Sequence, residues 1–338
     1  MKKFITAFLA GTVFALPFFS QSKNFSFELE PFFGIRNGVL NEYVYSKNSK
    51  TGEEYYLSLL NWNITNSLYS GFSADFGFRD FHVSGDLKAL LPNDFGSMND
   101  SDWLQDVGYK TGNSNVKTNY SVHDMSLIEG FNIGVKAFYD FHPVKSLTIA
   151  PSVGFSYETY SMMGKNGTYY YGKSNGSIPG GNTKYSYFSY DDAAHRTTGP
   201  FNGNVIKLER EDYYTWIGFN VLYTTPDSHW DFGLSADVSP WTYLVSRDTH
   251  FLNNGTTGTY YLDVGGQAFS AFRGTIFAQF NLNNLMALKL SGNGLCTTEI
   301  KGIEYTSSTV DGPYKKNGAV IGSASRYLDF QVSAKMKF

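Results

Sequence analysis

Cysteine is almost absent from this chain of 338 residues, in which Cys296 is the only one. A single thiol cannot form an internal disulfide, and it cannot supply a metal site built on several thiolates. Charge is also sparse, because Asp, Glu, Lys and Arg make up 17% of the residues and the net charge is −3. A basic surface for nucleic acid is therefore not expected, and we predict no nucleic-acid partner.

Long hydrophobic runs are missing from most of the chain. The one such run, from Phe4 to Phe19, follows two lysines and precedes small residues, which predicts a secretory signal peptide over residues 1–22. A helical membrane anchor is the alternative, and Pro17 and the shortness of the run disfavour it. Residues 23–338 then form the mature protein, which we expect to be a single domain without membrane helices.

Aromatic residues and glycine are abundant, with 29 Phe, 25 Tyr, 5 Trp and 34 Gly, a composition that favours strands and tight turns. The last eleven residues, LDFQVSAKMKF, alternate strictly between apolar and polar side chains. A period of two is typical of a strand with one apolar and one polar face. Eleven residues also match the ~9 to 11 that a tilted strand needs to cross a bilayer.

About ten segments of this kind occur along the chain, and their connections are of two sorts. Short connections lie near residues 77–81, 141–145, 225–228 and 281–284. Long connections cover roughly residues 36–57, 92–122, 160–212, 240–265 and 292–324. Short turns that alternate with long loops predict an all-β fold, a ten-stranded antiparallel transmembrane up-and-down β-barrel with long extracellular loops, in a bacterial outer membrane. A soluble β-sandwich is the alternative, but its strands average only ~5 to 6 residues.

Two pairs of polar residues at a spacing of two are the candidates for chemistry. Asp100 and Asp102 fall in the second long loop, and Asp248 and His250 in the fourth, so the two pairs are expected to face each other across the barrel mouth. A histidine backed by a carboxylate can take a proton from water, and two close carboxylates can share a proton. A solvated loop or a calcium site is the alternative for the aspartates, although calcium needs more oxygen ligands and the neighbour here is Trp103.

The segments GSMNDSDW and RDTH together resemble the omptin family of outer-membrane aspartate/histidine proteases. Four further segments fit the same family along the mature chain: NEYVYS, LLNWNIT, TNYSVHD and the terminal KMKF. The resemblance implies a ten-stranded barrel, an aspartic-type endopeptidase that acts on peptides or proteins, and an active cleft that faces the outside. It implies neither a metal nor another cofactor.

The resemblance also implies roles for individual residues. His250, oriented by Asp248, corresponds to the couple that activates the attacking water. Asp100 and Asp102 correspond to the opposing couple that holds the water and stabilises the tetrahedral intermediate. Glu42 matches the acid that receives a basic substrate side chain, and Met98 lies where the family lines the cleft.

The chain departs from the family pattern at Ser246, where the family has a second acid in its substrate-binding pocket. Loss of a partly buried charge partner costs ~1 to 3 kcal/mol, or about tenfold or more in affinity. The preference for Arg or Lys is therefore left open, with Glu42 as the remaining acid. The residues around Thr159 also lack the basic side chains by which the family holds lipopolysaccharide, so a need for this or another outer-leaflet lipid is open as well.

Two other classes of function remain for a barrel of this kind. A non-enzymatic adhesin or a narrow pore would show the same strand pattern, so only the two polar pairs distinguish it from a protease. An enzyme that acts on lipids would need a serine nucleophile with a histidine partner, and the sequence offers no G-x-S-x-G segment.

Overall fold

The computed structural model describes residues 24–47, 52–104, 116–174, 187–252 and 257–338. The predicted signal peptide, residues 1–22, lies outside these ranges. Within them the regular structure consists of strands, and no helix is long and apolar enough to cross a membrane. The strands are β1 (Phe25–Lys47), β2 (Glu54–Phe78), β3 (Phe81–Leu90), β4 (Asn93–Asp102), β5 (Asn119–Tyr139), β6 (Phe141–Val144), β7 (Leu147–Gly172), β8 (Arg196–Thr224), β9 (Trp230–Ser239), β10 (Thr242–Leu252), β11 (Thr257–Gln267), β12 (Ala271–Asn281), β13 (Met286–Thr297), β14 (Ile300–Ser307) and β15 (Lys315–Lys337).

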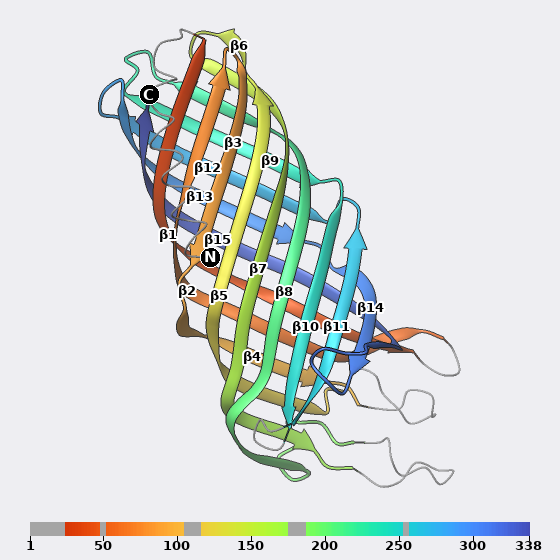
Figure 1. Cartoon of the computed structure of the whole chain (residues 1–338). Coiled ribbons are helices and arrows are strands. Elements are labelled where there is room, and N and C mark those ends of the chain that lie inside the picture. Colours follow the sequence, from red (N-terminus) through yellow and green to blue (C-terminus); the bar gives the residue numbers. More distant parts are fainter. Residues whose placement is uncertain (1–23, 48–51, 105–115, 175–186, 253–256) are drawn as a thin grey trace.

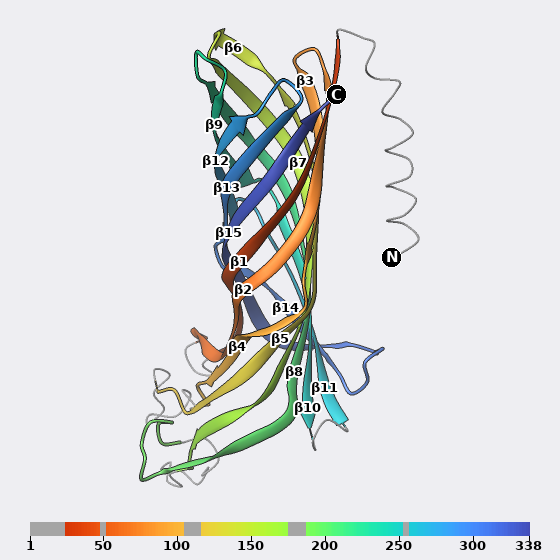
Figure 2. The ribbon, with the colours of Figure 1, turned by 90° about the vertical axis from the view of Figure 1, so that its left-hand side faces the viewer.

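All these strands belong to one antiparallel sheet that closes on itself, because β1 pairs with β15 as well as with β2. β3 and β4 run between the same two neighbours, β2 and β5, and so together occupy one strand position in the barrel wall. We call each such position, whether it holds one long strand or two short ones, a stave. β9 with β10, β12 with β11, and β13 with β14 form staves in the same way, and β6 is a four-residue arm on β7. Ten staves therefore surround the interior, as the sequence predicts (Figures 1 and 2).

The staves are longer than the sequence pattern indicates, and this corrects the predicted loops. β7 extends to Gly172 and β8 begins at Arg196, although residues 160–212 were expected to form a loop. Likewise, the two polar pairs lie in β4 and β10 and not in loops. The reason is that the outer ends of the staves carry polar side chains on both faces, so the alternation that marks a strand in the sequence disappears there.

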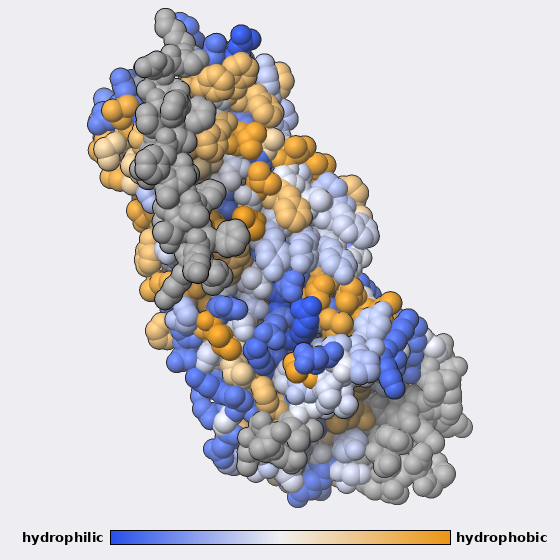
Figure 3. Space-filling view, viewed as in Figure 1, coloured by the Kyte–Doolittle hydropathy of each residue, from blue (hydrophilic) through white to orange (hydrophobic). Residues whose placement is uncertain are grey.

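Apolar side chains cover the outside of one half of the barrel, as the orange patches in Figure 3 show. On β15, Phe330 and Val332 are 56% and 57% exposed, whereas Asp329 and Ser333, which flank them, are buried. A soluble sandwich buries its apolar faces, so this inverted arrangement excludes that alternative and fits a surface in contact with lipid. The apolar belt lies toward the short turns, the start of β1 and the C-terminus, and the polar outer ends of the strands project beyond it (Figures 1 and 3).

A buried ion network joins opposite walls inside the barrel. Arg36 of β1 donates to both carboxylate oxygens of Asp329 on β15 at 2.7 and 2.9 Å, and reaches Glu158 of β7 at 2.6 Å. Lys88 of β3 also contacts Asp329 at 2.6 Å, and Tyr327 donates to Glu158 at 2.5 Å. Because these side chains cross the interior between four staves, they fill it with polar groups that satisfy one another.

An apolar cluster fills the next layer toward the outer end. Its side chains come from β1, β2, β3, β4, β5, β7 and β8, and most are fully buried. The largest members are Trp62, Tyr69, Met98, Met125, Tyr160 and Met162. This layer forms a solid floor on which the outer part of the barrel rests.

The ion network makes a prediction about stability. Replacing Arg36 with Ala leaves the buried carboxylates of Glu158 and Asp329 without their main cation, so the free energy of unfolding should fall by about 3 to 5 kcal/mol. Denaturant unfolding of the barrel in lipid measures this change. The control is Lys301→Ala, which breaks an exposed pair with Glu54 and should cost about 0 to 1 kcal/mol. Equal losses in the two variants would show that the network does not stabilise the barrel.

Candidate active site

Asp100 and Asp102 lie at the outer end of β4, on the same face as Met98, whose side chain is fully buried in the apolar floor. Their backbone partners are Leu60 and Ser58 on β2 and Ser121 and Asn119 on β5. Because alternate residues of a strand point the same way, both carboxyl groups face the interior above the floor. The sequence prediction that the two aspartates share a face is confirmed.

Burial raises the pKa of both aspartates. The pKa of Asp100 lies well above its usual range because of burial and the nearby charge of Asp102, although a 3.5 Å hydrogen bond from Ser58 opposes the rise. Burial raises the pKa of Asp102 to about 6, against hydrogen bonds from Ser58 and Asn119. Two close carboxyl groups that are both hard to ionise share a proton readily, so the couple can donate one hydrogen bond while it retains a negative charge.

Asp248 and His250 lie on β10 between β8 and β11, and they share the interior face with Ser246. The His250 ring packs against Tyr261 of β11, with the ring centroids 4.8 Å apart. Burial lowers the pKa of His250 to about 4, so the imidazole is neutral at pH 7 and can accept a proton. The pKa of Asp248 is raised well above its usual range by burial and by the charges of three neighbouring acids.

The two couples occupy opposite walls of the barrel. Along the closed sheet, β4 and β10 are separated by β5, β7 and β8, so their staves lie four steps apart in a ring of ten. Met98 of β4 and Leu208 of β8, which pairs with Asp248, belong to the same apolar floor. The sequence prediction that the couples face each other fits this placement, and both lie beyond the apolar belt.

Glu42 and Ser246, two of the three residues assigned to substrate binding, are in direct contact. Ser246 Oγ donates to Glu42 Oε1 at 2.7 Å from the opposite wall, and Trp62 Nε1 donates to Glu42 Oε2 at 2.8 Å. Both side chains are buried, and burial raises the pKa of Glu42 against these hydrogen bonds. Met98, also assigned to substrate binding, has no accessible surface and contributes to the floor below.

The structure adds a serine and histidine pair that sequence reasoning missed. Ser121 Oγ lies 2.7 Å from His123 Nε2, and His123 Nδ1 lies 2.5 Å from the carbonyl oxygen of Asn166. The carbonyl only accepts hydrogen bonds, so Nδ1 carries the proton and Nε2 accepts from the serine. Both side chains are buried, and Ser121 pairs with Asp100 along the backbone, which places this pair beside the aspartates on the same face of the sheet.

Two acids near Asp248 were also missed. Asp263 of β11 pairs with Ser246, and Glu304 of β14 pairs with Asp263, so both point into the interior at the level of Ser246. In the sequence, each of these acids is visible only as one acidic residue on the polar face of its own strand, Asp263 on β11 and Glu304 on β14. The sequence does not show that these acids lie near Asp248, because the register between strands decides which polar residues meet.

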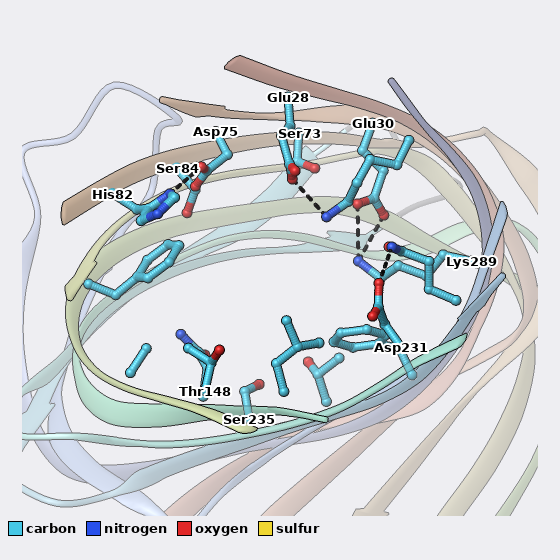
Figure 4. Close-up of a pocket in the computed structure, with 18 of the residues that line it drawn as sticks. Glu28, Glu30, Ser73, Asp75, His82, Ser84, Thr148, Asp231, Ser235 and Lys289 are labelled. Carbon is cyan, nitrogen blue, oxygen red and sulfur yellow. Dashed lines mark hydrogen bonds and ion pairs between the residues drawn. The ribbon is translucent and has the colours of Figure 1, made fainter. Parts of the chain in front are cut away.

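A separate polar cavity of about 420 Å³ lies inside the barrel toward the short turns (Figure 4). Its carboxylates are paired: Lys289 contacts Glu30 at 2.9 Å and His82 contacts Asp75 at 2.7 Å. Neither catalytic couple lines this cavity. Within the described part of the chain, no three His, Cys, Asp or Glu side chains are arranged to hold a metal ion.

Comparison with known proteins extends the argument. The sequence model of the Omptin family matches residues 22–187, which include Glu42, Asp100 and Asp102. The crystal structure of the outer membrane protease OmpT from Escherichia coli has a TM-score of 0.76 over 94% of this chain and 100% of that chain, at 17% identity. At this identity, the likeness establishes a shared fold that includes the half of the chain with Asp248 and His250.

Two other outer-membrane structures are far less similar. The toluene transporter TodX of P. putida has a TM-score of 0.24 at 8% identity, over 94% of this chain and 91% of that chain. Neisserial surface protein A has a TM-score of 0.23 at 8% identity, over 90% and 95%. No curated protein sequence matches the chain. The family match, the lipid-facing belt and the whole-chain likeness to OmpT together show that the chain belongs to the omptin family of outer-membrane proteases.

Proposed function

We propose that the protein is an endopeptidase in which His250, assisted by Asp248, activates a water molecule for attack on a peptide bond. Asp100 and Asp102 hold the same water and the reacting carbonyl from the opposite wall. The observation that carries this proposal is the placement of the two couples on inward faces of opposite staves, above a solid floor and outside the apolar belt.

The proton movements of this mechanism follow from the charges of the four side chains. Neutral His250 takes a proton from the water as the oxygen attacks, and the ionised Asp248 stabilises the imidazolium that forms. The shared proton of Asp100 and Asp102 is donated to the oxygen that becomes negative in the tetrahedral intermediate. As the C–N bond breaks, the imidazolium gives its proton to the leaving amine, and the hydroxyl formed from the carbonyl oxygen returns its proton to Asp100 and Asp102. These two transfers restore the starting state.

Three features of the molecule favour this proposal over its rivals. The apolar floor and the Arg36 network fill the interior between the couples and the short turns, which argues against a pore. Ser121 is only 2% exposed, which argues against a serine nucleophile because a substrate could hardly reach its hydroxyl, although that hydroxyl donates to His123 Nε2. A pure adhesin would have no use for four interior titratable groups with shifted pKa values.

The substrates of the proposed enzyme are peptides or proteins that approach from outside the cell. Thr159 of β7 pairs with Phe131 and Glu211, and none of these three supplies a cation for a lipid phosphate. Lipopolysaccharide or another outer-leaflet lipid stays a proposed partner, so each assay is run with and without added lipopolysaccharide.

Replacing the proposed base should abolish cleavage. In His250→Ala, kcat/KM for an unbiased peptide library should fall by about 10² to 10⁴, because a positioned general base contributes that much. The matched control is His229→Ala, a change at an exposed histidine near the short turns that should leave cleavage unchanged. Full activity of His250→Ala in a folded barrel would refute the mechanism, and no cleavage by the wild type under either lipid condition would favour the adhesin.

The pKa of His250 predicts the acid limb of the pH profile. The base works only when neutral, and burial lowers its pKa to about 4, so activity should be lost as the pH falls through about 4. An ordinary exposed histidine would lose activity near pH 6.5 instead. The profile of kcat/KM against pH is measured in the wild type and in Asp248→Asn, because Asp248 must be ionised in the wild type and its own pKa is raised. A half-maximum between 6 and 7 that persists in Asp248→Asn would contradict a neutral base with a lowered pKa.

Direct attack by water predicts that no covalent intermediate forms. A fluorophosphonate should leave the protein mass unchanged, and the time course should lack an initial burst of product. Intact-mass spectrometry and stopped-flow assays check both points. A fluorophosphonate adduct on Ser121 that disappears in Ser121→Ala would replace the water mechanism with a serine mechanism.

A further inference from the structure

Four staves place polar side chains in one row across the interior wall. The backbone pairs run from Arg210 on β8 to Ser246 on β10, to Asp263 on β11 and to Glu304 on β14. Directly paired residues of antiparallel strands project to the same side, so the four side chains lie at one level. All four are buried.

Two more acids join this row. Glu42 reaches it from the opposite wall through its 2.7 Å hydrogen bond with Ser246, and Asp248 follows Ser246 by two residues on the same face. The charges of Glu42, Asp263 and Glu304 all act on Asp248. These four carboxyl groups form an acidic cluster, which we define as Glu42, Asp248, Asp263 and Glu304.

Among the residues that the structure describes, no cation pairs with the acidic cluster. Arg210 is the nearest one, but its guanidinium binds Asp212 at 3.0 Å and also donates to Ser323 and Ser325 on β15. One carboxylate oxygen of Asp248 and one of Asp263 are buried and have no hydrogen-bond partner. Buried carboxyl groups without partners are costly, which indicates that a ligand supplies the missing donors.

We propose that Asp263 and Glu304 are specificity-determining residues that, together with Glu42, bind the cationic side chain of the substrate residue beside the scissile bond. This inference rests on the proposed function, because Asp248 is both a member of the acidic cluster and part of the couple that activates water. Asp263 on β11 and Glu304 on β14 thus take the place of the family's second acid, which is Ser246 in this chain. A guanidinium, whose planar donors bind two carboxylates at once, fits this cluster better than a metal ion, for which the described residues offer no ligand set.

Binding of the cation would also prepare the catalytic couple. Without it, burial holds the pKa of Asp248 and of Asp263 well above their usual range and raises that of Glu304 to about 7. A positive charge beside these groups favours their ionised forms. The substrate cation therefore supplies the condition under which Asp248 can stabilise protonated His250, which ties cleavage to the correct side chain.

Matched peptides test the inference. Each pair carries arginine or its neutral isostere citrulline beside the cleaved bond, and kcat/KM is measured for the wild type, Asp263→Asn and Glu304→Gln. Both variants should lower the value for the arginine peptide by about 10- to 100-fold, because hydrogen bonds to a charged group are lost, and should change the value for the citrulline peptide by less than about threefold. The control is Asp311→Asn, which removes an exposed acid from the turn between β14 and β15.

A second variant shows whether the charge itself matters. Adding Ser246→Asp to Asp263→Asn returns a carboxylate to the cluster and should restore the preference for arginine. An arginine-to-citrulline ratio that stays at the wild-type value in both single variants would overturn the inference while leaving the protease intact. Equal rates for the two peptides in the wild type would overturn it without any variant, and a wild type that cleaves neither peptide, nor any other, would remove the proposed function as well.

Discussion

Closure of the sheet between β1 and β15 is the constraint on which the rest of the structure depends. A lipid bilayer offers no hydrogen bonds, so a strand edge exposed to it would leave a row of backbone groups unsatisfied. The ring of ten staves removes every such edge, and it divides each strand into a lipid face and an interior face. Once the ring is closed, all polar side chains of the belt must be accommodated inside, where they pair across the walls as Arg36 does with Glu158 and Asp329.

The same closed geometry gives the outer end its chemistry. Strands that continue beyond the belt carry side chains inward without the need to seal against lipid, so titratable groups from distant parts of the sequence meet above the apolar floor. Burial there makes ionisation of Asp100, Asp102 and Asp248 difficult and keeps His250 neutral. The largest cause of these shifts is the exclusion of water, and neighbouring carboxyl groups add to it at Asp100 and Asp248. The environment thus sets acid and base roles that the residue types alone do not fix.

Much of the fold could be predicted from the sequence because the belt imposes a strict period of two. The segment Leu328–Phe338 shows this directly: its apolar residues face outward and its polar residues face inward, as the alternation indicates. The outer ends of the strands could not be predicted, since the pattern of apolar residues outward and polar residues inward is lost beyond the belt, where Met162 and Leu208 are buried inside. The sequence therefore indicated that β7 ends too early and that β8 begins too late. The two couples could be recognised in the sequence because each spans only three consecutive residues of a single strand.

The remaining members of the site depend on register, which the sequence does not display. Asp263 and Glu304 lie 15 and 56 residues beyond Asp248 in the numbering, and only the pairing of β10, β11 and β14 brings them to it. Ser121 and His123 are two residues apart, but their hydrogen bond depends on a carbonyl of β7 that fixes the imidazole proton. Contacts within a strand can be read from spacing, whereas contacts between strands require the strand register and the lengths of the loops.

The apolar floor determines by which route a peptide can enter the barrel and its fragments can leave. Side chains of the apolar cluster and the Arg36 network occupy the interior of the described barrel between its outer end and the short turns. A chain that enters the outer end meets a dead end, so both of its fragments must return to the surroundings by the route of entry. The interior packing thus keeps both products of a cleavage on the side from which the substrate came.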